Sequence, residues 1–374
     1  MKDEEVYVMK IKALRSSFLE GVQIANRAIS QRSLLPILSG ILIESDKNMN
    51  LCATDLETTV FTKVDSKVER KGKTVIPSRL ILDILRNLPE ATVEIELIPD
   101  ESRVTIKCEK STFNLNALPA KDFPTPPSIL EKNKCSLSFN SFKEAINSVI
   151  KAASTDETRP MLTGVLMEIE KNTLKMVSTD SYRLALRKLK IKKGPKEKMR
   201  ALVPAKVLSE IMRLPIKDEE SIEIVLGENL ISFGTKVAKI VSRLIAENFP
   251  AYEQLLQKDF KTDFLVNTQE FENAIRRVST LAKEDSPIKL SIDKSGILLS
   301  ASTREVGDAK EKMEMKISKE PMEIAFNPKF LMDGILVIED EQTHIYLVDS
   351  LQPGIIKPKD RDDYLYLIMP VRIT

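Results

Sequence analysis

The sequence is poor in the residues on which most catalytic sites depend. Among its 374 residues there are one histidine, three cysteines and no tryptophan. A Ser-His-Asp or Cys-His site would have to use His344, which lies in the alternating segment THIYLV and is expected to be a solvated histidine on a strand. The cysteines are an odd number without close spacing, which fits neither a disulfide framework nor a zinc site and favours a reducing cytoplasm. They are Cys52, Cys108 and Cys135.

Glycine clusters, long apolar runs and an excess of one charge are also missing. The 11 glycines form neither a GxGxxG nor a GxxxxGK[ST] phosphate loop, and no HExxH, CxxC or EF-hand pattern occurs. We therefore expect no cofactor, no metal and no catalytic site. No apolar run approaches the roughly 20 residues of a membrane span, and the start MKDEEVYVMK lacks the apolar region of a secretory signal. With a net charge of +2, a nucleic-acid surface would need a local arrangement of positive charge.

What the sequence does contain is one pattern that occurs three times. Three amphipathic segments carry apolar residues spaced 4, 3 and 4, as on one face of an α-helix. A repeat of about one third of the chain follows, because the first residues of the second and third sets lie 124 and 129 residues after their predecessors. The three sets are Phe18, Val22, Ala25 and Ile29; Phe142, Ile146, Val149 and Ala153; and Phe271, Ile275, Val278 and Ala282.

A second helix is predicted in each copy, directly after a proline. Pro77, Pro204 and Pro328 suit the first turn of a helix, where their missing N–H is not needed. In the first copy the expected buried stripe is Leu80, Ile81, Ile84, Leu85 and Leu88. Segments with period-2 alternation close each copy, as in half-buried strands. We predict an α+β protein with three repeated domains, near 1–127, 132–252 and 262–374, each with two helices packed on antiparallel sheets.

The charge pattern and two repeated carboxylates each have two interpretations. Arg27 and Lys151 lie nine residues after the first phenylalanine of their sets, which is the opposite side of a helical wheel. The helical segments together are positive and the rest of the chain is negative, which fits a surface that meets phosphate, but ordinary solvated helix faces would look the same. Asp55 and Asp180 could pass for catalytic carboxylates, yet their equivalent places in two repeats favour a turn or cap role.

Several motifs together resemble a known family. The segments LLPILSGILIE, ATDLE, TRPMLTGVLME, STDSYRLAL, ENFPAY and YLIMPVRI are similar to the bacterial DNA polymerase III beta subunit, the replicative sliding clamp. The resemblance covers the whole chain and implies the DNA clamp fold, a ring-forming head-to-tail homodimer with helices lining the pore. It also implies a processivity factor without catalytic activity. The implied partners are double-stranded DNA bound without sequence preference, a clamp loader, the DNA polymerase III catalytic subunit and other proteins with clamp-binding motifs, and no membrane.

The resemblance also implies site residues. The peptide-binding pocket would use Leu162, Thr179, Tyr182, Arg183, Leu184, Pro250, Leu255, Ile368, Met369, Pro370, Val371 and Arg372. The DNA-binding candidates are Arg27, Arg32, Arg79, Lys151, Arg159 and Lys206, and the dimer-interface candidates are Phe113, Thr280 and Leu281. Without the resemblance, Leu162, Leu184 and Ile368 would be expected in a domain core. The chain departs from the family at four positions, which implies an altered peptide preference: Ser181 and Tyr182 replace Gly and His, Gln254 stands where Arg is common, and Thr374 extends the usual ending.

Three functional hypotheses follow from these patterns. The first is the sliding clamp, the second an enzyme that uses acid–base carboxylates on a repeated α+β framework, and the third a protein-binding scaffold that never meets DNA. The scarcity of histidine and the missing phosphate loops disfavour the second. The positive helical segments favour the first over the third only slightly, and the family resemblance carries most of that distinction.

Overall fold

The computed structural model describes most of the chain. The described residues are 9–29, 35–98, 103–129, 133–192, 194–217, 219–256, 259–282, 286–303, 307–315, 317 and 320–372. None of the helices within these ranges is long and apolar enough to cross a membrane. Internal contacts divide the chain into two compact units: unit 1 is Met1–Phe139 with Glu210–Leu244, and unit 2 is Asn140–Ser209 with Ile245–Thr374.

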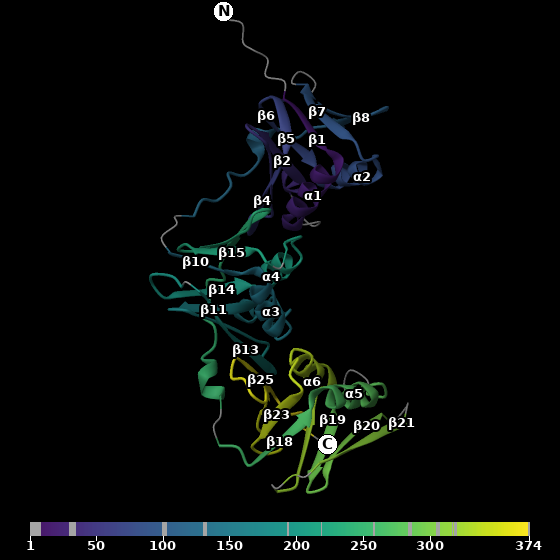
Figure 1. Ribbon diagram of the computed structural model, residues 1–374, viewed down its shortest axis with the longest axis vertical. Coiled ribbons are helices and arrows are strands. Elements are labelled where there is room, and N and C mark those ends of the chain that lie inside the picture. Colours follow the sequence, from purple (N-terminus) through teal and green to yellow (C-terminus); the bar gives the residue numbers. More distant parts are fainter. Residues whose placement is uncertain are drawn as a thin grey trace, which may run out of the picture. The chain divides into compact units, whose positions relative to one another are not determined.

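Unit 1 is built on two antiparallel sheets. The five-stranded sheet has the order β5-β1-β7-β8-β9, and the eight-stranded sheet has the order β10-β15-β16-β17-β4-β3-β2-β6. Helix α1 packs on β3, β4 and helix α2 (Figure 1). The elements are β1 Lys10–Leu14, α1 Arg15–Ala25, β2 Gly40–Ser45, β3 Met49–Thr54, β4 Thr58–Val64, β5 Ser66–Arg70, β6 Gly72–Pro77, α2 Ser78–Asn87, β7 Thr92–Ile98, β8 Arg103–Cys108, β9 Ser111–Asn116, β10 Asn133–Ser138, β15 Ser221–Leu226, β16 Leu230–Gly234 and β17 Ala238–Arg243.

Unit 2 follows the same plan. Its eight-stranded sheet has the order β14-β11-β12-β13-β25-β24-β23-β18, and its four-stranded sheet has the order β21-β20-β19-β22. Helices α3 and α4 extend across the boundary between the two units by one and three residues. The elements are α3 Phe139–Ile150, β11 Gly164–Glu170, β12 Thr173–Thr179, β13 Arg183–Lys190, β14 Met199–Pro204, α4 Ala205–Met212, β18 Thr262–Asn267, α5 Thr268–Ser279, β19 Ile288–Asp293, β20 Gly296–Thr303, β21 Gly307–Glu314, β22 Met322–Phe326, α6 Pro328–Ile335, β23 Gln342–Leu347, β24 Gly354–Pro358 and β25 Tyr364–Ile368.

The helices confirm the repeated pattern and correct its details. The first three residues of each predicted set are buried, but the fourth lies beyond the helix end, at Ile29, Ala153 and Ala282. The helical-wheel prediction for Arg27 and Lys151 is therefore wrong in its premise, because both residues follow the last residue of α1 or α3. In α2 the predicted stripe is too wide. Only Ile81, Leu85 and Leu88 are buried, whereas Ile84 is half-buried and Leu80 is 50 % exposed, because a helix that packs by one face buries a single stripe.

The sheets show how the repeats are joined. Four strands of one repeat continue into four strands of the next through the antiparallel pairs β17–β4 and β13–β25. Strands of the central repeat thus belong to both eight-stranded sheets, which is why contacts group the three repeats into two units. The α+β class with helices on antiparallel sheets is confirmed. The boundaries 1–127, 132–252 and 262–374 follow the repeat and stay a prediction.

Candidate functional site

A tight turn between β12 and β13 forms one side of the candidate site in unit 2. The Thr179 hydroxyl donates to the carbonyl of Arg183 at 2.7 Å and accepts from the N–H of Ser181 at 3.2 Å. The Asp180 carboxylate accepts from the N–H groups of Tyr182 and Arg183 at 2.9 and 3.0 Å. Asp180 therefore has the turn role predicted for it, and it holds Ser181 at a φ of 81°, where glycine is usual.

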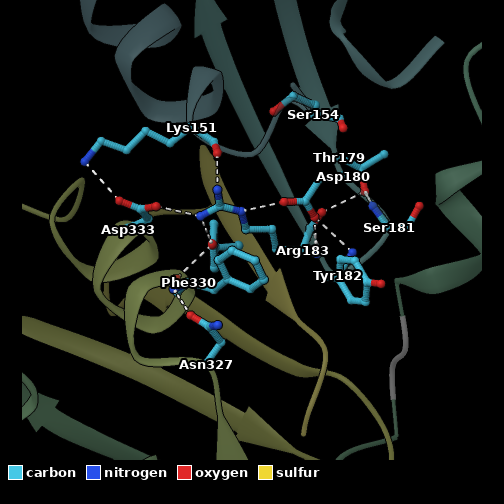
Figure 2. A network of polar contacts seen from close by, with 12 residues as sticks. Lys151, Ser154, Thr179, Asp180, Ser181, Tyr182, Arg183, Asn327, Phe330 and Asp333 are labelled. Atoms are coloured by element: carbon cyan, nitrogen blue, oxygen red, sulfur yellow. Dashed lines mark hydrogen bonds and ion pairs between the residues drawn. The ribbon is translucent and has the colours of Figure 1, made fainter. Parts of the chain in front are cut away.

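The Arg183 side chain extends from this turn into a buried polar network (Figure 2). Its Nε donates to Asp180 at 2.9 Å, and its Nη1 donates to Asp333 of α6 at 2.6 Å. Its Nη2 donates to the carbonyl oxygen of Lys151, and the guanidinium carbon lies 4.2 Å from the centre of the Phe330 ring. Only 7 % of the side chain is exposed. Arg183 thus links the end of α3, the turn and α6, and it holds these three parts of the site together.

Two further groups complete this network. The Tyr366 hydroxyl donates to the carbonyl of Phe330 at 2.8 Å and accepts from Arg183 at 3.4 Å. The Lys151 ammonium lies 3.2 Å from the other carboxylate oxygen of Asp333. Burial raises the pKa of Tyr366, so its phenol stays neutral and keeps its proton for the Phe330 carbonyl. Burial by itself would lower the pKa of Arg183, but Tyr366, Asp333 and Asp180 raise it above its usual value. The guanidinium is charged at every accessible pH.

An apolar cluster includes side chains of β12 and β13, the two strands that the turn connects. It brings together β11, β12, β13, β14 and β25 with the segment that follows Phe249. The Tyr252 ring is buried here, packs edge-on against Phe249 at 6.1 Å, and has the Lys175 ammonium 5.3 Å from its centre. The buried members are Leu166, Val177, Leu184, Leu186, Leu202, Phe249, Tyr252 and Leu367. This cluster is the core of the candidate site.

Apolar and basic side chains of the neighbouring segments remain exposed. Tyr182 is 61 % exposed, and its ring stacks on Phe330 with 6.4 Å between the centres. The segment after β25 is held at this place, because the N–H of Met369 donates to the carbonyl of Tyr182 at 2.8 Å and the N–H of Val371 donates to the carbonyl of Ala325 at 2.8 Å. The exposed members of the predicted pocket are Tyr182, Pro250, Leu255, Met369, Val371 and Arg372, with Pro370 half-buried. Most of them are apolar side chains that remain open to solvent in unit 2.

The remaining predicted pocket residues are buried. Leu162, Leu184 and Ile368 are buried, as expected for a domain core when the residues are considered alone. Thr179 and Arg183 shape the turn. The sequence analysis missed Phe330 and Asp333, although it predicted the helix that carries both. A helical pattern tells which face is buried, but it does not identify the partner on a distant strand.

Three of the DNA-binding candidates form ion pairs with carboxylates, and Lys151 among them is also exposed. Arg27 pairs with Glu210 at 3.0 Å, Lys151 with Asp333, and Arg159 with Asp156 at 3.0 Å. The Arg27 guanidinium also donates to the carbonyl of Arg213 at 2.7 Å. Arg79 and Lys206 are exposed in the first turns of α2 and α4, at equivalent places in two repeats. Arg32 lies outside the described residues.

The dimer candidates lie at two sheet ends. Phe113 is half-buried on β9, the last strand of the five-stranded sheet. Thr280 is exposed at the C-terminal end of α5, and Leu281 follows half-buried, with its carbonyl accepting from the Thr303 hydroxyl at 2.8 Å. Leu281 thus lies next to β20, the neighbour of the edge strand β21.

The histidine and the cysteines, which could in principle be catalytic, are hydrogen-bonded or buried. His344 lies on a strand as predicted, but it is not simply solvated, because its Nε2 lies 3.0 Å from Asp263 and its Nδ1 2.9 Å from the Tyr346 hydroxyl. Within the described ranges no group of three His, Cys, Asp or Glu side chains could hold a metal ion. All three cysteines are buried free thiols. Burial raises the pKa of Cys52 to about 12, which makes it a poor nucleophile.

Fold and site together define a class of protein: a threefold-repeated α+β clamp with exposed apolar side chains beside a buried ionic network, and with no metal-binding cluster in its described part. Models of the N-terminal, central and C-terminal domains of the DNA polymerase III beta subunit match residues 9–127, 136–251 and 253–372. The chain belongs to the DNA polymerase III beta subunit family. As a sliding clamp it confers processivity on DNA polymerase III and is a non-catalytic subunit.

Individual relatives agree with this assignment over nearly their whole length. The beta sliding clamp of Bacillus subtilis is 32 % identical over 377 residues, which cover 97 % of this chain and 100 % of the relative. The solved structure of the Bacillus subtilis clamp matches 98 % of this chain and 100 % of its own with a TM-score of 0.94. The Pseudomonas aeruginosa clamp bound to griselimycin is 28 % identical, with a TM-score of 0.92, and covers 98 % of this chain and 100 % of its own.

Proposed function

We propose that two copies of this chain close head to tail into a ring that encircles double-stranded DNA without sequence preference. The observation that carries the proposal is a pair of free sheet edges. In the repeat, β9 corresponds to β17 and β25, while β21 corresponds to β4 and β13. The counterparts pair with each other as β17–β4 and β25–β13. Strands β9 and β21 end their sheets, and no further strand pairs with either in the described part of the chain.

The side chains on β9 favour the proposal that a second copy covers this sheet edge. Phe113 faces Ile106 on β8 just as Ile240 faces Phe233 on the preceding strand of the next repeat. Ile240 is fully buried at its strand junction, whereas Phe113 remains half-buried. Pairing of β9 with β21 of a second copy would bury Phe113 in the same way and leave no open edge. Thr280 and Leu281 lie near β21 and would join this interface.

A ring of this composition has room for a duplex. Two chains with three repeats of two helices give twelve helices, which at an interaxial spacing of about 9 Å form a circle roughly 34 Å across. Subtracting about 10 Å for the helix thickness leaves a hole of roughly 24 Å. Arg79 and Lys206 are candidates for phosphate contacts because both are exposed in the first turn of a helix. Arg27, Lys151 and Arg159 would have to exchange their carboxylate partners for phosphate, so each is expected to be dispensable alone.

The exposed surface around Tyr182 and Met369 is the proposed docking place for linear peptides of the DNA polymerase III catalytic subunit, the clamp loader and other clamp-binding proteins. A tethered polymerase gains local concentration at the primer end without any change in its own active site. Exposed apolar side chains over a rigid core suit such peptides, and the methionine adapts to several sequences. The bacterial cytoplasm, where the chromosome lies, is the proposed place of action, and the free thiols fit a reducing compartment.

Solution mass and DNA retention test this function together. The purified chain, 42.2 kDa as a monomer, is expected to sediment at twice that mass at micromolar concentration. After a clamp loader has placed it on a nicked circular plasmid, it is expected to stay bound and to leave when the plasmid is linearised. A protein that stays monomeric, or that leaves circular and linear DNA equally fast, would contradict the ring.

A further inference from the structure

Unit 1 contains a cavity of about 320 Å³ on one face of its eight-stranded sheet. A β-carbon added to Gly21 of α1 would meet Leu51 and Val64, so α1 covers the face that carries these two side chains. The cavity lies on the opposite face, where side chains of β2, β3 and β4 alternate outward. Its main lining side chains are Leu42, Glu44, Asn50, Cys52, Phe61 and Pro126.

At the same place in unit 2 a buried tyrosine, Tyr252, packs on the equivalent side chains. The repeat aligns Leu42, Cys52 and Phe61 with Leu166, Val177 and Leu186, which are all members of the Tyr252 cluster. The strand registers agree, since Cys52 faces Leu42 and Phe61, and Val177 faces Leu166 and Leu186. In the segments that follow, FPTP aligns with FPAY, so that Pro126 takes the place of Tyr252. The cavity of unit 1 is thus a tyrosine site without its tyrosine.

The rim of the cavity carries an excess of positive charge. Lys63, Lys236 and Lys239 are exposed around it, against one carboxylate, Glu44. None of the three lysines makes an ion pair with any residue that the structure describes. In unit 2 the position of Lys239 is taken by Leu365, because these residues face Phe61 and Leu186 in the two registers. The rim of unit 1 is therefore suited to acidic groups on either side of an aromatic ring.

A second cavity lies beside the first. It measures about 270 Å³, includes Leu56 and Arg243, and shares Pro126 with the first cavity. An extended peptide whose aromatic side chain enters the first cavity can therefore continue along the Pro124–Pro127 segment. Both volumes lie at the lower end of the range for small-molecule sites and are adequate for single side chains.

We propose that this cavity is a binding site for an extended partner peptide that inserts a tyrosine or phenylalanine ring beside acidic residues. The occupant is inferred from the chain's own repeat. In unit 2 the Tyr252 ring belongs to the same cluster as Leu166, Val177 and Leu186, the equivalents of the side chains that line the cavity. The site belongs to unit 1 and is separate from the surface around Tyr182. It would let the chain hold two peptides at once.

The test uses two probes on the full-length protein. The first is p-cresol, which represents the ring alone, and the second is a fluorescein-labelled pentapeptide, Glu-Asp-Tyr-Asp-Glu. Methyl NMR is expected to show saturable shifts at Leu42 and Val237 with both probes and none at Leu255. The same peptide with alanine in place of tyrosine is expected to bind at least 10-fold more weakly.

Variants then separate the ring pocket from the charged rim. Pro126→Tyr is expected to close the cavity from within and to abolish the shifts with both probes. The exposed double variant Lys63→Glu, Lys239→Glu tests the rim without touching the core, and it is expected to weaken peptide binding at least 10-fold while p-cresol still binds. The matched reversal Lys196→Glu, Lys294→Glu on unit 2 is expected to change peptide binding less than twofold. Absence of saturable shifts at Leu42, or binding indifferent to both Pro126→Tyr and the rim variant, would overturn the proposal.

Discussion

The turns that precede β4 and β13 have equivalent backbone hydrogen bonds, but their side chains make different contacts. In unit 1 the Thr54 hydroxyl donates to the carbonyl of Thr58 at 3.0 Å, and Asp55 accepts from the N–H of Thr58 at 2.7 Å. The residue after each aspartate has a positive φ, 76° at Leu56 and 81° at Ser181. The hydrogen bonds of the two turns are the same, residue by residue, with an offset of 125.

The two regions differ in side chains at and near these turns. Thr58 occupies the place of Arg183, and Pro126 the place of Tyr252. Unit 2 therefore has a buried ionic network and a tyrosine in its apolar cluster. Unit 1 has an apolar cluster without a tyrosine and two cavities, of which the second is lined by the turn residues Leu56 and Glu57. The repeated turn is the common support, and a few substituted side chains decide which surface becomes rigid and which remains open.

Arg183→Ala is the change expected to affect this comparison most. It removes the partner of Asp333 and Asp180 and leaves the carbonyl of Lys151 without its donor, all in a site with little access to water. Removal of one member of a buried ionic network costs about 3–5 kcal/mol of the free energy of unfolding. Urea denaturation of the full-length protein measures this loss.

Thr58→Ala is the matched control in unit 1. The half-buried Thr58 side chain has no ionic network around it, so the expected loss is within about 0.5 kcal/mol. Arg183→Lys is expected to recover only part of the stability, because an ammonium cannot reproduce the forked geometry of the guanidinium. Equal losses in Arg183→Ala and Thr58→Ala would mean that the turn, and not the network, holds this region.

Alkaline conditions are expected to lower the stability of unit 1 at a lower pH than that of unit 2. All three cysteines belong to unit 1, and burial raises the pKa of Cys52 to about 12 and of Cys135 to about 11. A raised pKa gives stability that is complete below the unfolded value, about 8.5 for a thiol, and is lost as the pH rises toward the folded value. Each such thiol removes up to about 1.4 kcal/mol per pH unit above 9.

Unit 2 has no cysteine and is expected to lose stability only above pH 10. Burial raises the pKa of Tyr252, Tyr364 and Tyr366, whose unfolded value is near 10. Denaturation followed by circular dichroism at pH 8, 9 and 10 gives the slope, and Cys52→Val, which copies Val177 of unit 2, is expected to reduce it. An unchanged slope in that variant would show that Cys52 does not titrate on unfolding.

Tyr182→Ala is expected to weaken docking more than folding. The ring is exposed and stacked on Phe330, so its removal costs little core packing but takes away an aromatic contact of the proposed docking surface. We expect about a tenfold loss of affinity for a peptide of the polymerase catalytic subunit, measured by fluorescence anisotropy, and a change in unfolding free energy below about 1 kcal/mol. Glu57→Ala, at the equivalent place in unit 1, is the control and should leave that affinity intact.

The repeated helices, strands and turns could be predicted from the sequence, whereas side-chain contacts between distant segments could not. Helix faces, period-2 strands and the turn roles of Asp55 and Asp180 were accessible, because each depends on residues a few positions apart. The contacts of Arg183 with Asp333 and Phe330 were not, since they join residues about 150 apart whose types are ordinary in their own segments. Helix ends were also misplaced, because a half-buried alanine or isoleucine looks the same in the sequence whether it lies inside a helix or in the turn after it.

Substitutions at the positive-φ residues give the smallest expected effect and test whether the two turns carry equal strain. A β-carbon in this conformation costs on the order of 1 kcal/mol, whereas glycine loses about 0.5–1 kcal/mol through the flexibility of the unfolded chain. Ser181→Gly and Leu56→Gly are therefore expected to change thermal stability by less than about 0.5 kcal/mol in either direction. Ser181→Val should instead lose more than about 1 kcal/mol, because a branched β-carbon fits this conformation poorly. If Ser181→Val unfolds at the same temperature as the parent, the φ of 81° is not enforced by the hydrogen bonds of Thr179 and Asp180, and the equivalence of the two turns is only one of sequence.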